Sequence, residues 1–215
     1  RRIGYERDGR GVLFTDKLIP RRVGRKFLPV PTLDYYLSIV HYLGGEAYEG
    51  DHLMEVATRP EDDERAAGLL AGAKGKPEVL LNPGAQKEFK RWPAERFAQL
   101  AARCTNELGG AVAATGSPAE RDVLARVTGA ATTTIIDLPK AGMNVRLLKS
   151  VTKQCALMVT NDTGPRHLAA ACDTPLITLF GPTTPDWTEI GYDKERQVVA
   201  RDAGHAESMK QITVD

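Results

Sequence analysis

Residues 159–171 read VTNDTGPRHLAAA, in which a polar, glycine-containing turn joins an apolar run to an alanine-rich one. The apolar run is typical of the end of a buried strand, and the alanine-rich run is typical of a helix. Pro165 suits the first helical position, where its missing N–H costs nothing. The N–H groups of Gly164, Arg166 and His167 are then expected to point out of the helix end, where the helix dipole favours anions. The turn therefore predicts a phosphate site, which the side chains of Arg166 and His167 could also hold.

This turn also has a plain structural interpretation, because Asp, Thr and Gly before a helix are ordinary capping residues. Strand–turn–helix units occur in most α/β proteins, so the turn alone leaves ligand binding and simple capping equally open. Residues 174–185 favour binding: they read TPLITLFGPTTP, a second buried-strand run followed at once by a Gly/Pro/Thr loop. Loops after the carboxyl ends of parallel strands gather at one edge of the sheet, where ligands bind.

Outward from these loops, strand-like and helix-like segments alternate at the lengths of βαβ units. This alternation predicts an α/β protein with a parallel sheet and helices on both faces. The expected strands in this half are 78–81, 111–114, 134–137, 156–160 and 176–180. The expected helices are 93–108, 119–127, 144–153 and a segment containing 168–172.

The first third of the chain is less regular. We expect strands at 11–15 and 52–57 and helices at 32–43 and 61–70. The Gly/Lys-rich run at 71–77 has the composition of a turn and predicts a domain boundary.

The composition is that of a soluble globular protein, with 42% hydrophobic and 27% charged residues in a chain of 215. The net charge of +1 argues against nucleic-acid binding. One basic stretch, 21–26 (RRVGRK), is interpreted as a solvated loop, with contact to an anionic acceptor or to a membrane surface as the alternatives. Cys104, Cys155 and Cys172 match no metal or disulfide pattern, and no signal peptide or membrane span is apparent. We therefore expect a cytoplasmic protein with free thiols.

Several common motifs are missing, which argues against a P-loop NTPase, a standard dinucleotide dehydrogenase, an α/β-hydrolase and a resident metal. A second loop of interest, 82–93 (NPGAQKEFKRWP), follows the first strand of the regular half and precedes a helix. Its Lys and Arg side chains could reach a diphosphate on the helix ends. The plain alternative for Lys90 is an exposed surface lysine.

Four ordered motifs in this chain resemble those of the ADP-heptose:lipopolysaccharide heptosyltransferases, which are bacterial glycosyltransferases of the GT-B type. The motifs are 82–85 with 90–93, 116–120 (GSPAE), 161–171 and 179–185 (LFGPTTP). The resemblance implies a GT-B fold with a Rossmann-like nucleotide-sugar donor domain at 76–200. Residues 1–75 are then expected to be the C-terminal part of an N-terminal, acceptor-side α/β domain, and 201–215 a C-terminal tail.

The resemblance also implies residues that bind the donor. Lys90 is similar to the family lysine that contacts the diphosphate, and Glu120 to the acidic residue near the ribose. Met143 stands where the family contacts the adenine, although a core methionine is an equally plain interpretation. Asp162 is expected to cap the helix, orient His167 or hold sugar hydroxyls rather than touch phosphate. The residues that match the donor-binding turn are Asp162, Thr163, Gly164 and His167.

The activity implied by the resemblance is inverting transfer of heptose from ADP-heptose to a lipopolysaccharide inner-core acceptor, without metal or cofactor. Lys90 and the helix end would stabilise the departing ADP, and peripheral contact with the inner membrane surface is an expectation for the basic stretch. The family's general base is an aspartate of an N-terminal region that residues 1–75 do not match, so the catalytic residue is unknown and the chain is expected to be a fragment. The alternatives are a glycosyltransferase with another nucleotide-sugar donor and a nucleotide-binding module without catalysis.

Overall fold

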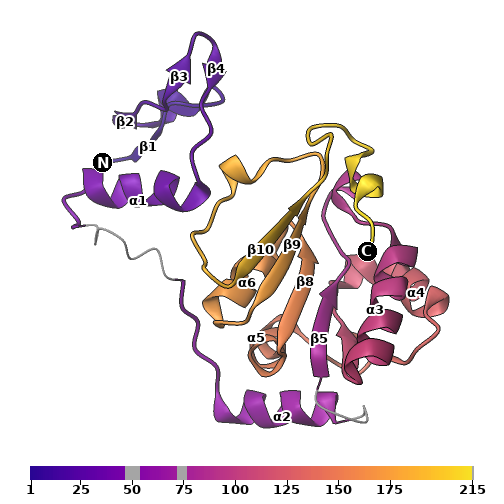
Figure 1. Cartoon of the computed structure of the whole chain (residues 1–215). Helices are drawn as coiled ribbons and strands as arrows, with labels where there is room; N and C mark the ends of the chain where they lie inside the picture. The colour runs from indigo at the N-terminus through magenta and orange to yellow at the C-terminus, as the bar shows by residue number, and fades with distance from the viewer. Residues whose placement is uncertain (47–53, 72–76, 215) are drawn as a thin grey trace. The chain divides into compact units, whose positions relative to one another are not determined.

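The computed structural model describes residues 1–46, 54–71 and 77–214 of the chain (Figure 1). Contacts divide the chain into two compact units, Arg1–His52 with Pro185–Gly191 and Leu53–Thr184 with Tyr192–Asp215. Among the described residues, none of the helices combines the length and the apolar character that crossing a membrane requires.

The second unit is built on a six-stranded sheet with the strand order β10-β9-β8-β5-β6-β7. Every neighbouring pair of strands in it is parallel. The strands are β5 (Pro77–Asn82), β6 (Ala111–Ala114), β7 (Ile135–Asp137), β8 (Leu157–Asn161), β9 (Leu176–Phe180) and β10 (Glu195–Val199). The predicted parallel α/β sheet is thus confirmed, and each of its five predicted strands is present. β10 was not predicted, because it is an edge strand whose ERQVV sequence lacks the apolar run of a buried strand.

Helices cover this sheet as α/β alternation requires. They are α3 (Ala94–Leu108), α4 (Arg121–Ala130), α5 (Val145–Gln154) and α6 (Gly164–Ala171). In Figure 1, α3 and α4 lie to one side of the sheet and α5 and α6 to the other. The change of side follows from the topology: the chain first steps outward through β6 and β7, then returns to β8 on the far side of β5. The core between these layers is formed by fully buried apolar side chains such as Leu81, Phe97, Val112, Leu147 and Phe180.

A further helix, α2 (Pro60–Leu70), confirms the helix predicted at 61–70 and belongs to the second unit. It packs on α5, where Asp62 is buried and accepts a hydrogen bond from Arg146 (Nη2–Oδ1 2.8 Å). The division by contacts therefore comes earlier in the chain than the predicted boundary at residue 75. Most of the turn that predicted that boundary, 72–76, lies outside the described residues.

The first unit holds a parallel pair, β1 (Ile3–Tyr5) and β2 (Asp16–Leu18), and an antiparallel pair, β3 (Arg22–Val23) and β4 (Lys26–Phe27). Its helix α1 (Thr32–Tyr42) confirms the helix predicted at 32–43.

Both strands predicted in the first third are wrong as far as they are described. Arg10–Leu13 forms a 3-10 helix, because Asp8 and Gly9 take left-handed backbone angles (φ 55° and 75°) and turn the chain sharply before it. Residues 54–57 form no strand, and the rest of the predicted 52–57 segment lies outside the described residues.

Candidate functional site

A pocket of about 560 Å³ opens in the second unit beyond the carboxyl ends of β5 and β8. These strands are neighbours in the sheet, and the helices that follow them, α3 and α6, lie on opposite faces. The chain thus leaves these two neighbouring strands toward opposite faces of the sheet, an arrangement called a topological switch point. A crevice forms between the two diverging loops, and ligands of open α/β sheets bind in this crevice. The lining comes from three loops, within 82–91 after β5, 117–120 after β6 and 162–165 after β8.

The buried amide of Asn161 fixes two of these loops to each other. Its Oδ1 accepts from the backbone N–H of Trp92 (3.0 Å), and its Nδ2 donates to the carbonyls of Pro83 (3.0 Å) and Gly84 (3.1 Å). The indole of Trp92 donates in turn to the carbonyl of Ile212 (2.9 Å). Every polar atom of the Asn161 side chain is therefore used to hold the 82–92 loop in shape.

Lys90 and Asp162 form an ion pair at the wall of the pocket. The distance from Nζ of Lys90 to Oδ2 of Asp162 is 3.1 Å, and Thr183 Oγ1 donates to the same carboxylate oxygen (3.3 Å). The Lys90 side chain is 25% exposed and the Asp162 side chain 6%, so the lysine is the partner that faces solvent. Asp162 does not cap α6, because Thr163 occupies the N-cap position.

Thr163 and Gly164 line the pocket at the start of α6. The Thr163 hydroxyl accepts from Nδ2 of Asn82 (3.2 Å) and donates to the carbonyl of Asn161 (3.2 Å). Gly164 is exposed, which leaves the first turn of α6 accessible from the pocket.

Arg166 does not serve as the phosphate-holding side chain that the sequence predicted. It is completely buried, and its guanidinium makes two hydrogen bonds with Glu195 of β10, from Nε to Oε1 (2.6 Å) and from Nη2 to Oε2 (2.8 Å). Its backbone N–H donates to the carbonyl of Thr163 (3.1 Å), so this amide is not free for an anion either. The partner that draws Arg166 inward lies on the strand that the sequence analysis missed, and no local pattern around Glu195 signals the pair.

His167 is half-buried on α6 and is not among the residues that line the pocket. Burial lowers its pKa below the ordinary value, and the charge of Arg166 adds to the shift, while Asp162 and Glu195 oppose it. The imidazole is therefore neutral at pH 7.

Glu120 lines the pocket and completes a capping box with Ser117, whose N–H donates to Oε2 of Glu120 (2.7 Å). The carboxylate lies against Gly84, where an added Cβ would stand 2.2 Å from Oε1 of Glu120. Glycine at 84 is thus what allows the carboxylate to reach the pocket wall. Met143 is half-buried, with its sulfur 3.8 Å from Thr115 Oγ1, and does not line the pocket.

The structure thus brings five of the seven predicted donor residues to one pocket: Lys90, Glu120, Asp162, Thr163 and Gly164. Three contacts were not predicted from the sequence: those of Thr183 with Asp162, of Asn161 with the 82–92 loop and of Glu195 with Arg166. Thr183 and Asn161 lie in motifs that the sequence analysis had singled out, so a signal for them was present.

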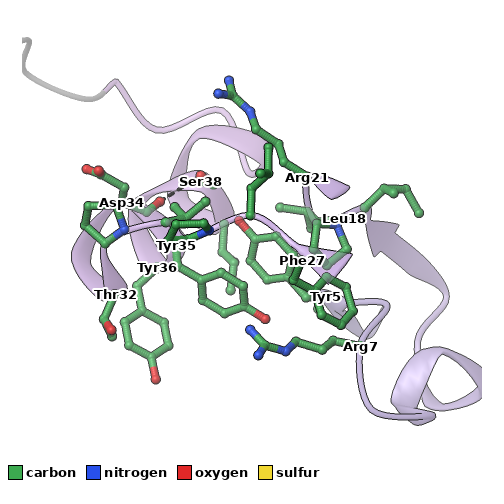
Figure 2. A pocket seen from close by; sticks show the side chains of 18 of the residues that line it. Tyr5, Arg7, Leu18, Arg21, Phe27, Thr32, Asp34, Tyr35, Tyr36 and Ser38 are labelled. Carbon is green, nitrogen blue, oxygen red and sulfur yellow. Dashed lines mark hydrogen bonds between the residues drawn. The ribbon is translucent and has the colours of Figure 1, made fainter. Parts of the chain in front are cut away.

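The first unit has a pocket of its own, of about 1080 Å³ (Figure 2). The rings of Tyr5 and Tyr35 stack in it with their centroids 3.7 Å apart. The guanidinium of Arg7 lies 4.8 Å from the ring centroid of Phe27 and 5.8 Å from that of Trp187. Flat aromatic faces beside a cation can bind a sugar ring that carries a negative group. This pocket was not predicted from the sequence, although Arg21 of the basic stretch lines it.

Comparison with known proteins gives the chain a family. The model of "Glycosyltransferase family 9 (heptosyltransferase)" matches residues 2–214. Lipopolysaccharide heptosyltransferase 2 of Salmonella typhimurium is 37% identical over 120 residues, which are 53% of this chain and 33% of that protein. Lipooligosaccharide heptosyltransferase 2 of Haemophilus influenzae is 35% identical over 123 residues, 55% of this chain and 35% of that protein. The matched parts are thus about a third of these relatives.

Solved structures show the same fold. "E. coli ADP-heptose lps heptosyltransferase II" aligns with a TM-score of 0.76 at 22% identity, covering 100% of this chain and 66% of that one. "E. coli heptosyltransferase WaaC with ADP" aligns with a TM-score of 0.58 at 19% identity, covering 94% of this chain and 56% of that one. The predicted GT-B type of fold is confirmed.

Proposed function

Because this chain belongs to glycosyltransferase family 9 (heptosyltransferase), we propose that its second unit binds ADP-heptose and that the protein transfers the heptose to a lipopolysaccharide inner-core acceptor. The pocket at the switch point carries the proposal: Lys90 stands there beside the first turn of α6, at the place where a diphosphate is held in such folds. Relatives bearing the name heptosyltransferase and a related fold solved with ADP support it.

In the proposed reaction an acceptor hydroxyl attacks the anomeric carbon of the heptose. The new glycosidic C–O bond forms as the C–O bond to the diphosphate breaks, with inversion, and ADP leaves with the bonding electrons. Lys90 and the N-terminus of α6 stabilise the growing negative charge on the leaving group, and each well-placed donor of this kind contributes about 2.7–4 kcal/mol in the transition state. The hydroxyl proton goes to a general base that we do not assign to any residue of this chain.

Around the leaving group, we assign Glu120 to the ribose and, on the family resemblance alone, Met143 to the adenine, although Met143 lies outside the lining of the pocket. Oε2 of Glu120 already accepts from Ser117, and its remaining lone pairs suit ribose hydroxyls. Asp162 is assigned to hold Lys90, and Thr163, Gly164 and His167 to the α6 end of the donor site.

On the acceptor side, we assign the aromatic and cationic pocket of the first unit to the anionic inner-core sugars. The rings of Tyr5 and Tyr35 can stack on a sugar ring, and the guanidinium of Arg7 can donate two parallel hydrogen bonds to a carboxylate or phosphate. We further propose a cytoplasmic location, with the basic stretch 21–26 in peripheral contact with the anionic inner membrane surface.

The donor assignment is tested by titrating the chain with ADP, UDP and GDP in a calorimeter. ADP is expected to bind, and UDP and GDP are expected to bind more weakly, because the site is assigned to adenine. Equal binding of the three nucleotides would contradict an ADP-specific donor site, and binding of none would contradict a donor site in this chain.

Gly84→Ala is expected to weaken ADP binding as much as Glu120→Ala does, by about 0.5–1.5 kcal/mol, the net contribution of one hydrogen bond. The reason is steric: the new methyl group would displace the Glu120 carboxylate from its place against residue 84. Calorimetry of the two single variants and of the double variant measures this. The double variant should bind no worse than either single one, and additive losses would show that Gly84 acts independently of Glu120.

A further inference from the structure

A buried row of alternating charges runs inward from the wall of the donor pocket. Lys90 Nζ lies 3.1 Å from Asp162 Oδ2, Asp162 Oδ1 lies 3.5 Å from Arg166 Nη1, and Arg166 is bound to Glu195 by two hydrogen bonds of 2.6 and 2.8 Å. Exposure of the side chains falls along the row, from 25% for Lys90 and 6% for Asp162 to 0% for Arg166 and 2% for Glu195. Lys90 and Asp162 line the pocket, Lys90 is the more exposed of the two, and Arg166 and Glu195 are not part of the lining.

The inner end of this row is held by several contacts. The guanidinium of Arg166 lies 5.0 Å from the ring centroid of Phe180, and both carboxylate oxygens of Glu195 accept from it. Glu195 also accepts from the hydroxyl of Thr178 and from Nε2 of Gln197 (3.1 Å). Burial raises the pKa of Glu195, but the hydrogen bonds from Arg166 and Thr178 outweigh it and hold the pKa below its ordinary value. Glu195 is therefore a carboxylate at neutral pH.

The negative charge of Glu195 decides where Asp162 can lie. With Glu195 ionised, Arg166 has a bidentate partner on one side and attracts the Asp162 carboxylate only across 3.5 Å, which leaves the outer oxygen of Asp162 to Lys90. Without that charge, the attraction of the buried Arg166 for the Asp162 carboxylate, 3.5 Å away, would no longer be opposed by an ionised Glu195 on its other side. The attraction between Arg166 and Asp162 is strong in a buried site, so the Asp162 carboxylate would move inward and leave Lys90.

We propose that Glu195, which does not line the pocket, is a positioning residue for Lys90. Glu195 anchors Arg166, Arg166 sets the place of the Asp162 carboxylate, and Asp162 holds the ammonium group of Lys90 at the pocket wall. The inference rests on the proposed function in one respect, because it takes Lys90 to be the residue that meets the donor diphosphate.

The test is a double-mutant cycle on the affinity for ADP, with wild type, E195Q, K90M and the E195Q/K90M double variant. We expect E195Q to weaken ADP binding about tenfold when Lys90 is present, a coupling of about 1.4 kcal/mol, and to have no effect in the K90M background. Glu107→Gln is the matched control, because it removes the carboxylate that pairs with Arg103 on α3 (2.8 Å), away from the pocket. The control should bind ADP as wild type does.

A second readout needs no ligand. Reductive methylation followed by peptide mass spectrometry gives the reactivity of Lys90 relative to the other lysines. We expect Lys90 to react faster in E195Q than in wild type, because its amine is released from Asp162, and to be unchanged in Glu107→Gln. The methylation experiment separates the two proposals. If wild type does not bind ADP, the proposed function fails. The methylation rate of Lys90 still tests the role of Glu195 in that case.

Unfolding curves show whether E195Q is folded. If it is not, Thr178→Val takes its place, since it removes only the hydroxyl that donates to Glu195. The changes in ADP affinity and in the methylation rate of Lys90 should then have the same signs and be smaller. Equal loss of affinity in both Lys90 backgrounds would overturn the inference, because it would show a general structural effect. A gain of affinity would also overturn it, since Asp162 would then restrain Lys90 rather than position it, and so would an unchanged methylation rate.

Discussion

Lys90→Met is expected to weaken ADP binding by about 1.5–3 kcal/mol, roughly 10- to 150-fold, the contribution of a hydrogen bond to a charged group. Two effects act in the same direction. The diphosphate loses its cation, and Asp162 loses the lysine that faces it at 3.1 Å, so the pocket wall becomes more negative. Calorimetric titration with ADP measures the loss, and unfolding curves confirm that the variant is folded.

Lys87→Met provides the matched control for this experiment. Lys87 lines the same pocket, so its loss changes the net charge of the site equally, but the residue is exposed and its charge is screened by solvent. Its effect should stay below about 1 kcal/mol. If both variants weaken binding equally, the general charge of the pocket accounts for the binding, and the ion pair with Asp162 has no special part in it.

Arg166→Ala is expected to lower the free energy of unfolding by about 3–5 kcal/mol, because removing one partner of a buried ion pair leaves the other without compensation. The uncompensated group is Glu195, whose side chain is 2% exposed on β10. Urea denaturation monitored by circular dichroism measures the loss.

The double variant Arg166→Met/Glu195→Met separates the charge effect from a packing effect. Replacing a buried ion pair by apolar side chains of similar volume is often close to neutral, so the double variant should recover most of the lost stability. Arg103→Ala breaks an exposed pair with Glu107 and should cost less than about 1 kcal/mol. If the double variant is as unstable as Arg166→Ala, the shape of the arginine, and not its charge, maintains the fold.

The buried strands of the second unit could be predicted because each is a short apolar run between turn residues. β10 could not, because an edge strand has few apolar neighbours and its ERQVV sequence carries no such run. Because β10 was not predicted, Glu195 was not identified as the partner of Arg166. The prediction that Arg166 holds a phosphate was wrong for this reason. A sequence shows that an arginine stands at a helix start, but whether it faces solvent depends on a partner 29 residues away.

The candidate donor site was predictable in part. Lys90 and Asp162 are 72 residues apart, and they meet because the strands before them, β5 and β8, are neighbours in the sheet. The alternation of segments predicted loops on one edge, yet it could not single out Lys90 from the other cations of its loop, which required the family resemblance. The first unit was least predictable, because its elements are short and its pocket draws residues from 4–42 together with Trp187 and Thr188.

The return of Pro185–Gly191 to the first unit bears on how recombinant hybrids between relatives should be made. In this chain the guanidinium of Arg7 lies over the ring of Trp187. An exchange of residues 1–52 alone would replace Arg7 by the residue of another protein and leave Trp187 unchanged. A faithful hybrid therefore needs three junctions, one near residue 53 and one on each side of 185–191. Shuffling with a single crossover would divide the residues that line the pocket of the first unit between two parents, so a changed binding preference could not be told from a damaged pocket.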